Sequence, residues 1–140
     1  MSALGKVLSV HQMLYERSGG RVGHRMLGTP TLLLRTTGRR SGQPRTNALV
    51  YLADGEDYVV VASKGGDDHP PAWLLNLTAE PSVEVQLGRE RRPATARVLE
   101  PDDADYERLW RQVNENNSGR YDGYQAKTQR PIPLVVLTPS

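Results

Sequence analysis

The residues best suited to chemistry are basic and lie beside glycines. Segment 36–45, TTGRRSGQPR, follows an apolar run and contains Arg39, Arg40, Ser41 and Arg45. Glycine lets the backbone approach a ligand closely, and guanidinium groups bind phosphate or carboxylate through paired N–H donors. The segment therefore predicts an anion-binding loop between two strands, and a solvated basic hairpin tip is the alternative.

A second group of donors ends the apolar run 58–62. It combines a hydroxyl, an ammonium and backbone N–H groups, from Ser63, Lys64, Gly65 and Gly66. Successive backbone N–H groups in such a turn can form a concave surface for an anion. Taken alone, however, these residue types are also common in plain turns.

Two aromatic groups could complete a ligand site. Ala72 and Trp73 begin a short helix predicted over 69–77, where the indole either presents a flat surface to a ligand or packs in the core. Tyr121 and Tyr124 are three residues apart in a polar segment, which is an unusual setting for core aromatics. We expect these groups to meet the arginine loop on the outer face of a small barrel.

The composition narrows the classes of function. The chain has 140 residues, a net charge of +2, three scattered histidines and no cysteine. It therefore offers no thiolate nucleophile, no disulfide and no histidine cluster for a metal, and it shows no evident carboxylate pair. Few aromatic residues accompany the basic ones, which argues against nucleic-acid binding. Any chemistry is expected to belong to a bound cofactor that the protein orients.

The hydrophobic pattern predicts a single α+β domain over residues 1–140, built on a small antiparallel barrel. A second internal helix is expected after an N-cap at Asp102, with Trp110 in the core and a loop over 114–119. Strands are expected over 31–36, 45–52, 58–62, 82–87, 95–99 and 132–138.

An amphipathic helix is predicted over 1–18, followed by a connector over 19–30. The helix is expected to pack on the barrel, and its basic flank makes peripheral contact with a membrane surface the alternative. No apolar run is long enough to span a membrane, and no signal-peptide pattern opens the chain. A cytoplasmic location is therefore expected.

Four separated motifs, in this order, resemble the deazaflavin-dependent nitroreductase family of actinobacteria. They are residues 36–45, 63–66, 71–77 and 121–125, with Ile132-Pro133 after the last. The resemblance implies an FMN-binding split-barrel-like fold, related to flavin-reductase and pyridoxamine-phosphate-oxidase barrels, with antiparallel strands and flanking helices. It also implies the cofactor coenzyme F420, an 8-hydroxy-5-deazaflavin.

The resemblance implies a role for each basic group. Lys64 and Arg45 hold the phosphate region of the coenzyme, and the loop of Arg39 and Arg40 meets its oligoglutamate tail. The remaining coenzyme contacts are hydroxyl, backbone and ring-facing groups, from Ser41, Ser63, Gly65, Gly66, Ala72 and Trp73. Several cations on a small chain are explained by an extended ligand with several negative charges.

Tyr121 and Tyr124 match family tyrosines on the substrate side of the ring. The resemblance implies that they are catalytic, closing the pocket and supplying a hydrogen bond or a proton. Nitro-prodrug reductases of the family carry further aromatics where this chain has Val50, Ser118 and Lys127. A wider and more polar pocket is therefore expected, with quinones favoured over bulky bicyclic nitro compounds.

The expected reaction is hydride transfer from reduced F420 to a quinone, an enone or a nitroaromatic compound. An FMN-dependent reductase with the same barrel stays open, because arginines alone do not distinguish a short phosphate from a long anionic tail. A non-catalytic F420 carrier is a second alternative. The expected partner is a small-molecule electron acceptor rather than a nucleic acid, and the chain is expected to be a monomer or a homodimer.

Overall fold

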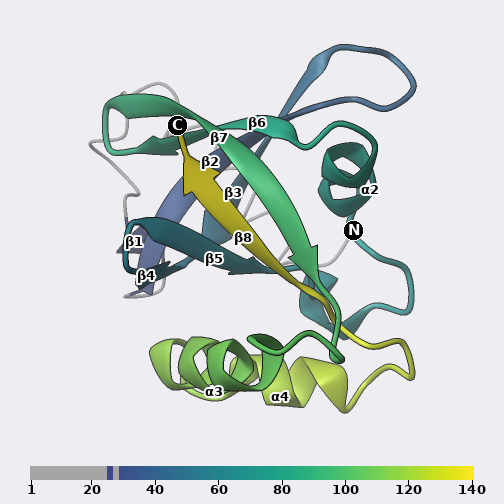
Figure 1. The fold of residues 1–140 in the computed structure, drawn as a ribbon. Coiled ribbons are helices and arrows are strands. Elements are labelled where there is room, and N and C mark those ends of the chain that lie inside the picture. The colour runs from purple at the N-terminus through teal and green to yellow at the C-terminus, as the bar shows by residue number, and fades with distance from the viewer. Residues whose placement is uncertain (1–24, 27–28) are drawn as a thin grey trace.

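The computed structural model describes residues 25–26 and 29–140 (Figure 1). The helix predicted over 1–18 lies outside the described residues, and so does most of the connector predicted over 19–30. Part of that connector is instead strand, since β1 (Arg25–Met26) pairs with the start of β2.

The strands form a curled antiparallel sheet. They lie side by side in the order β3-β2-β6-β7-β8-β5-β4, and β1 pairs with the first residues of β2. The predicted α+β class with an antiparallel split barrel is confirmed. The strands that follow β1 are β2 (Thr29–Thr37), β3 (Pro44–Val50), β4 (Leu52–Asp54), β5 (Asp57–Val61), β6 (Ser82–Leu87), β7 (Glu90–Leu99) and β8 (Leu134–Pro139).

One stretch of chain joins the two edges of this sheet. β3 pairs with β2 at one edge, β4 pairs with β5 at the other, and Tyr51 alone separates β3 from β4. Because the same stretch serves both edges, the sheet curls into a barrel. The single strand predicted over 45–52 is therefore wrong at Tyr51, whose N–H donates to Pro30 O at 3.1 Å.

β5 and β8 are buried on both faces. Val60 and Val135 point into the barrel core, whereas Val59 and Val136 point into a second apolar cluster. α3 (Tyr106–Asn116) and α4 (Arg120–Gln125) cover that second face, side by side at the bottom of Figure 1. The continuous apolar sequences of these two strands follow, because alternate residues belong to different cores.

α2 (Ala72–Ala79) lies against another side of the barrel, beside β2 (Figure 1). It confirms the helix predicted over 69–77, although it begins after the prolines and extends to Ala79. Leu74 and Leu77 pack into the barrel core. Within residues 25–26 and 29–140, no helix is long and apolar enough to cross a membrane.

The predictions around α3 were less accurate. The N-cap is Asp105 rather than Asp102, because the Asp103 carboxylate accepts from the N–H of Asp105 and closes a turn before the helix. The loop predicted over 114–119 is wrong in its first part, since α3 continues to Asn116. Trp110 is half-buried rather than fully inside the core.

Candidate active site

A cavity of about 1030 Å³ lies where four segments meet. These are the β2–β3 loop with strand β3, the short helical turn η1 (Lys64–Gly66), the start of α2, and α4. Every site residue predicted from the sequence lines this cavity except Gly66. The fold therefore brings together residues that are far apart along the chain.

The cavity wall is basic. Arg39, Arg40 and Arg45 come from the β2–β3 hairpin, Lys64 comes from η1, and Arg120 comes from α4. None of the described residues that line the cavity is aspartate or glutamate. Such a concentration of one charge in a concave site raises the local concentration of anionic ligands.

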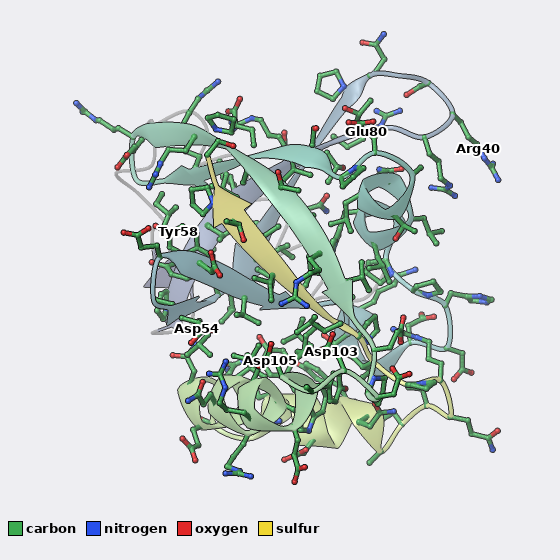
Figure 2. The ribbon with its side chains drawn as sticks, viewed as in Figure 1. Arg40, Asp54, Tyr58, Glu80, Asp103 and Asp105 are labelled. Carbon is green, nitrogen blue, oxygen red and sulfur yellow. The ribbon has the colours of Figure 1, made fainter. Side chains whose placement is uncertain are left out.

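Carboxylates beside α3 are paired away from this cavity. Asp54 and Asp103 form ion pairs with Arg108 and Arg97, at 3.2 and 3.4 Å. Figure 2 shows Asp54 and Asp103 near α3, on the opposite side of the molecule from the loop that carries Arg40. These acidic groups therefore do not neutralise the basic wall of the cavity.

Backbone hydrogen bonds close the loop between β2 and β3. The N–H of Gly38 donates to Gln43 O, and the N–H of Gly42 donates to Gly38 O, both at 2.8 Å. A Cβ at Gly38 would lie 2.6 Å from Ser41 Oγ and 3.1 Å from the backbone oxygen Gln43 O, so a larger residue there would force the Ser41 side chain to move and would crowd the turn. Ser41 Oγ also accepts from Arg45 Nη2 at 3.5 Å, and the two side chains face the same cavity.

Asn76 on α2 holds Arg39 in place, and the sequence analysis missed it. Asn76 Oδ1 accepts from the backbone N–H of Arg39 at 3.1 Å and from its Nη1 at 3.3 Å. Asn76 Nδ2 donates to Thr36 Oγ1 at 3.4 Å. The sequence did contain a signal for Asn76, which is a polar residue on the apolar face of a short helix. A buried amide needs hydrogen-bond partners, so such a residue is expected to hold a neighbouring segment.

The η1 turn has three consecutive residues in the left-handed backbone region. Their φ angles are 46° at Lys64, 65° at Gly65 and 87° at Gly66, and the first is strained because a non-glycine residue rarely adopts this conformation. The N–H of Gly66, expected as a ligand donor, donates to Ser63 O at 2.9 Å within the turn. Gly66 instead packs η1 against α4, since a Cβ there would lie 2.6 Å from Tyr124 O.

Arg130 holds the η1 turn without lining the cavity. Its guanidinium donates to Ser63 O at 2.9 Å and to Ala62 O at 3.3 Å, and its Nε donates to Asp67 O at 2.8 Å. Because these carbonyls lie before and after η1, one side chain ties together the two ends of the strained turn. Hydrogen bonds of this kind offset the cost of the unusual backbone.

Arg130→Gln is expected to loosen the η1 turn. The free energy of unfolding should fall by about 1–2 kcal/mol, because a charged donor to several carbonyls is lost. The amides of Gly66 and Asp67, which bond within the turn, should lose protection in hydrogen exchange followed by NMR. Arg97→Gln, on the outer surface of β7, is the control. Unchanged protection of both amides in Arg130→Gln would contradict this role.

Tyr121 and Tyr124 lie side by side on α4 and line the cavity. Their ring centroids are 6.1 Å apart with an interplanar angle of 71°. Tyr121 is buried, which the polar sequence around it did not predict, and its ring packs against Trp110 at 6.5 Å. The indole N–H of Trp110 donates to Asp122 at 2.8 Å, which braces this aromatic cluster from the outside.

Burial raises the pKa of Tyr106 and of Tyr121 to about 12. For Tyr121, a hydrogen bond with Asn117 and the charge of Arg120 oppose the effect of burial on the pKa. Tyr106 donates to Ile132 O at 2.5 Å, away from the cavity. Tyr121 therefore keeps its proton at neutral pH and can act as a hydrogen-bond donor toward the cavity.

Alkaline pH is expected to destabilise the fold through these two phenols. Because folding raises their pKa values from 10.0 to about 12, their stabilisation is complete below a pH of about 10 and is lost as the pH rises toward 12. The free energy of unfolding should fall by on the order of 2 kcal/mol per tyrosine. Urea denaturation at several pH values measures this fall. Tyr106→Phe should remove about half of it, and an unchanged pH dependence would contradict the prediction.

Trp73 belongs to both the barrel core and the cavity wall. Its side chain is 5% exposed and packs in the core cluster, yet it lines the cavity. Ala72, beside it, is exposed and also lines the cavity. The indole thus forms part of a rigid wall, and little of its surface is open for stacking.

Asn117 and Arg120 also line the cavity, and the sequence analysis did not consider either residue. Val50, noted as the replacement of an aromatic, is a lining residue too. Ser118 and Lys127 are not among the lining residues, so neither widens the cavity directly.

Known proteins resemble this chain over most of its length. The model of the F420H(2)-dependent quinone reductase family matches residues 7–139. An F420H(2)-dependent quinone reductase of Mycobacterium tuberculosis is 52% identical over 134 residues, which cover 95% of this chain and 90% of that protein.

Two solved structures are similar in both sequence and fold. An F420-H2 dependent reductase (FDR-A) is 38% identical with a TM-score of 0.69, and the match covers 77% of this chain and 93% of that one. A protein described as a domain-swapped dimer is 34% identical with a TM-score of 0.71, and the match covers 97% and 99% of the two chains.

Proposed function

The chain belongs to the F420H(2)-dependent quinone reductase family, and we propose that it oxidises reduced coenzyme F420 and reduces a quinone. The observation that carries this proposal is the basic cavity, which gathers cations from the β2–β3 hairpin, η1 and α4. Members of the family are oxidoreductases, and the chain is an enzyme of that class.

The residues of the cavity suit coenzyme F420. The coenzyme is an extended molecule with a deazaflavin ring, a phosphodiester and an oligoglutamate tail. Guanidinium and ammonium groups bind phosphate and carboxylate strongly, and the hairpin and η1 supply both kinds of cation. The cavity volume of about 1030 Å³ lies at the upper end of the usual range for small-ligand pockets, as a long ligand requires.

We assign Lys64 and Arg45 to the phosphate region of the coenzyme, and Arg39 and Arg40 to its tail. The hydrogen bonds from Arg39 to Asn76 support the assignment of Arg39 to the tail, since they fix Arg39 relative to α2. The other proposed coenzyme contacts are hydroxyl, backbone and ring-facing groups, from Ser41, Ser63, Gly65, Ala72 and Trp73.

The bound, reduced deazaflavin supplies a hydride. The protein would hold the coenzyme and the acceptor in one cavity and donate a hydrogen bond to the acceptor oxygen. Tyr121 and Tyr124 are the proposed catalytic residues, because both line the cavity and Tyr121 keeps its phenol proton at neutral pH.

Quinones are the proposed acceptors, with enones and nitroaromatic compounds as further substrates. Each of these compounds gains negative charge on oxygen when it accepts a hydride, so a hydrogen-bond donor assists all of them. Val50 on the cavity wall offers no aromatic surface for a bulky bicyclic nitro compound. We therefore expect quinones to be reduced faster than such nitro compounds.

Two further expectations stay predictions. FMN is a second candidate cofactor, because the loop arginines suit a short phosphate as well as a long anionic tail. The chain is proposed to be a monomer or a homodimer, and one solved relative is described as a domain-swapped dimer. Peripheral membrane contact through residues 1–18 has no supporting observation.

Anaerobic oxidation of reduced F420 by menadione, followed by the absorbance of the deazaflavin, tests the proposed function. We expect oxidation to depend on the enzyme and to be much slower with reduced FMN. Tyr124→Phe should lower kcat more than it changes the Kd for F420. Tight binding of F420 without enzyme-dependent oxidation would instead favour a non-catalytic carrier. Faster oxidation of reduced FMN would contradict the assignment of F420 as the cofactor.

A further inference from the structure

The end of the cavity beside α4 carries two polar residues that have no role in the assignments above. Asn117 directly follows α3, Arg120 begins α4, and both line the cavity beside Tyr121. Arg120 Nη1 donates to Asn117 Oδ1 at 2.9 Å, and Asn117 is buried. A buried amide joined to a cation therefore lies next to a proposed catalytic tyrosine.

The Asn117 amide connects Arg120 to Tyr121. Its Oδ1 accepts from Arg120, and its hydrogen bond with Tyr121 lowers the pKa of the phenol against the larger effect of burial. A hydrogen bond lowers the pKa of a phenol when it is donated to the phenol oxygen, because it stabilises the phenolate. Because Asn117 Oδ1 already accepts from Arg120, Asn117 Nδ2 is the group placed to donate to Tyr121, and the phenol hydrogen is then available to a ligand in the cavity.

Backbone hydrogen bonds hold Asn117 at the end of α3. Its N–H donates to Val113 O and Asn114 O, both at 3.1 Å, and its carbonyl accepts from the N–H of Arg120 at 3.2 Å. The amide side chain is therefore anchored through its own backbone as well as through its bond to Arg120. The backbone bonds fix where the side chain starts, and the bond from Arg120 orients its amide.

Arg120 is separated from the other cations of the cavity. Among the described lining residues, the remaining basic side chains lie on the β2–β3 hairpin and on η1, where they are assigned to the coenzyme. Arg120 instead shares α4 with Tyr121 and Tyr124. Its charge therefore lies beside the two tyrosines, where we assign the acceptor, and not on the hairpin or η1, which we assign to the coenzyme.

We propose that Arg120, Asn117 and Tyr121 form an oxyanion-binding site for the carbonyl oxygen of the quinone. Arg120 binds this oxygen electrostatically, Tyr121 donates a hydrogen bond to it, and Asn117 is a positioning residue that orients both groups. The proposal rests on the proposed function, because it concerns a quinone that is reduced by a hydride.

The balance of electrons and protons in quinone reduction shows at which step negative charge forms on the quinone oxygen. The quinone gains two electrons and one hydrogen as a hydride and becomes a hydroquinone monoanion, and one proton then completes the hydroquinone. The reduced coenzyme loses the same hydride and also one proton, so atoms and charge balance overall. Preorganised donors lower the barrier most where negative charge develops, which here is the quinone oxygen.

Substitutions at Arg120 test the electrostatic part of this proposal. Arg120→Gln is expected to lower kcat/KM for menadione by about 10- to 100-fold, while the Kd for F420 changes less than about twofold. Arg120→Lys should recover part of the loss because it restores the charge. Arg111→Gln on α3 is the matched control, since Arg111 is exposed and lies outside the cavity.

A series of substituted quinones separates charge stabilisation from a structural role. Arg120→Gln should slow reduction of electron-rich quinones most, because these acceptors need the most help to carry negative charge. Asn117→Asp keeps an acceptor for Arg120 but cannot donate to Tyr121, so the phenol would donate to the new carboxylate instead of the quinone. We expect this variant to lose kcat while its Kd for F420 is retained.

The outcomes distinguish this proposal from the proposed function. If the wild-type protein does not oxidise reduced F420, the proposed function fails before any variant is compared. If it does, but Arg120→Gln slows all quinones equally or weakens F420 binding as much as it slows turnover, the oxyanion site is wrong. An unchanged kcat in Asn117→Asp would likewise remove Asn117 from the site.

Discussion

Lys64→Ala is expected to weaken binding of coenzyme F420 by about 10- to 100-fold. Lys64 is exposed on the cavity wall and contributes an ammonium at the start of η1. Losing a charge-assisted contact to phosphate costs about 1.5–3 kcal/mol, which corresponds to this change in affinity. Isothermal titration calorimetry at low ionic strength measures the Kd of both proteins.

The dependence of the Kd on salt provides a second measure of the same contact. Raising the ionic strength should weaken coenzyme binding by the wild-type protein more than by Lys64→Ala, because one paired charge is absent in the variant. Arg97→Ala removes a cation from β7, outside the cavity, and should leave the Kd unchanged. Equal affinities of the wild type and Lys64→Ala would exclude Lys64 from the phosphate site.

Gly66→Ala should lower the free energy of unfolding by about 3 kcal/mol, through two effects that act together. The φ angle of 87° is unfavourable for alanine, and the new Cβ would lie 2.6 Å from Tyr124 O and 3.1 Å from Lys127 Cβ. Backbone cannot move away as easily as a flexible side chain, so η1 and α4 would have to separate. Urea denaturation of the purified variant measures the loss.

Gly65→Ala is the matched control for this variant. Its φ angle of 65° imposes a similar backbone strain, but no atom lies within 4 Å of the added Cβ. We expect a loss of about 1 kcal/mol, from strain alone. Equal losses in the two variants would show that the contact between η1 and α4 does not depend on glycine at position 66.

Much of the candidate site was predictable because its chemistry is local in the sequence. The glycines that close the β2–β3 loop lie beside Arg39 and Arg40, and Ser63 and Lys64 come two and three residues after the end of β5. In both segments, glycines that predict a turn lie next to side chains that can bind an anion. The expected barrel already placed these segments on one outer face, and the resemblance to a family then assigned them to one coenzyme.

The roles of the other residues could not be predicted, because they depend on contacts between segments that are far apart in the sequence. Tyr51 interrupts a strand because the chain passes from one edge of the sheet to the other, which only the closed barrel requires. Arg130 finds its carbonyl partners more than 60 residues earlier in the chain. A periodicity analysis has no access to such long-range partners.

The asparagines around α3 misled the prediction for a related reason. Asparagine is unfavourable inside helices because its amide competes for backbone hydrogen bonds. Here Asn114 Nδ2 donates to Trp110 O at 2.9 Å, and Asn116 Nδ2 donates to Tyr51 O at 3.0 Å. These contacts satisfy the amides, so the helix continues through residues that favour a loop in isolation.

Coenzyme binding in the basic cavity is tested most directly by titrating the Trp110→Phe variant with F420 and, separately, with FMN. The chain has two tryptophans, so this variant leaves Trp73, on the cavity wall, as the fluorescent reporter. We expect saturable quenching by F420 at micromolar concentrations and much weaker binding of FMN. Tighter binding of FMN, or saturable binding of neither, would contradict the assignment of this cavity to coenzyme F420.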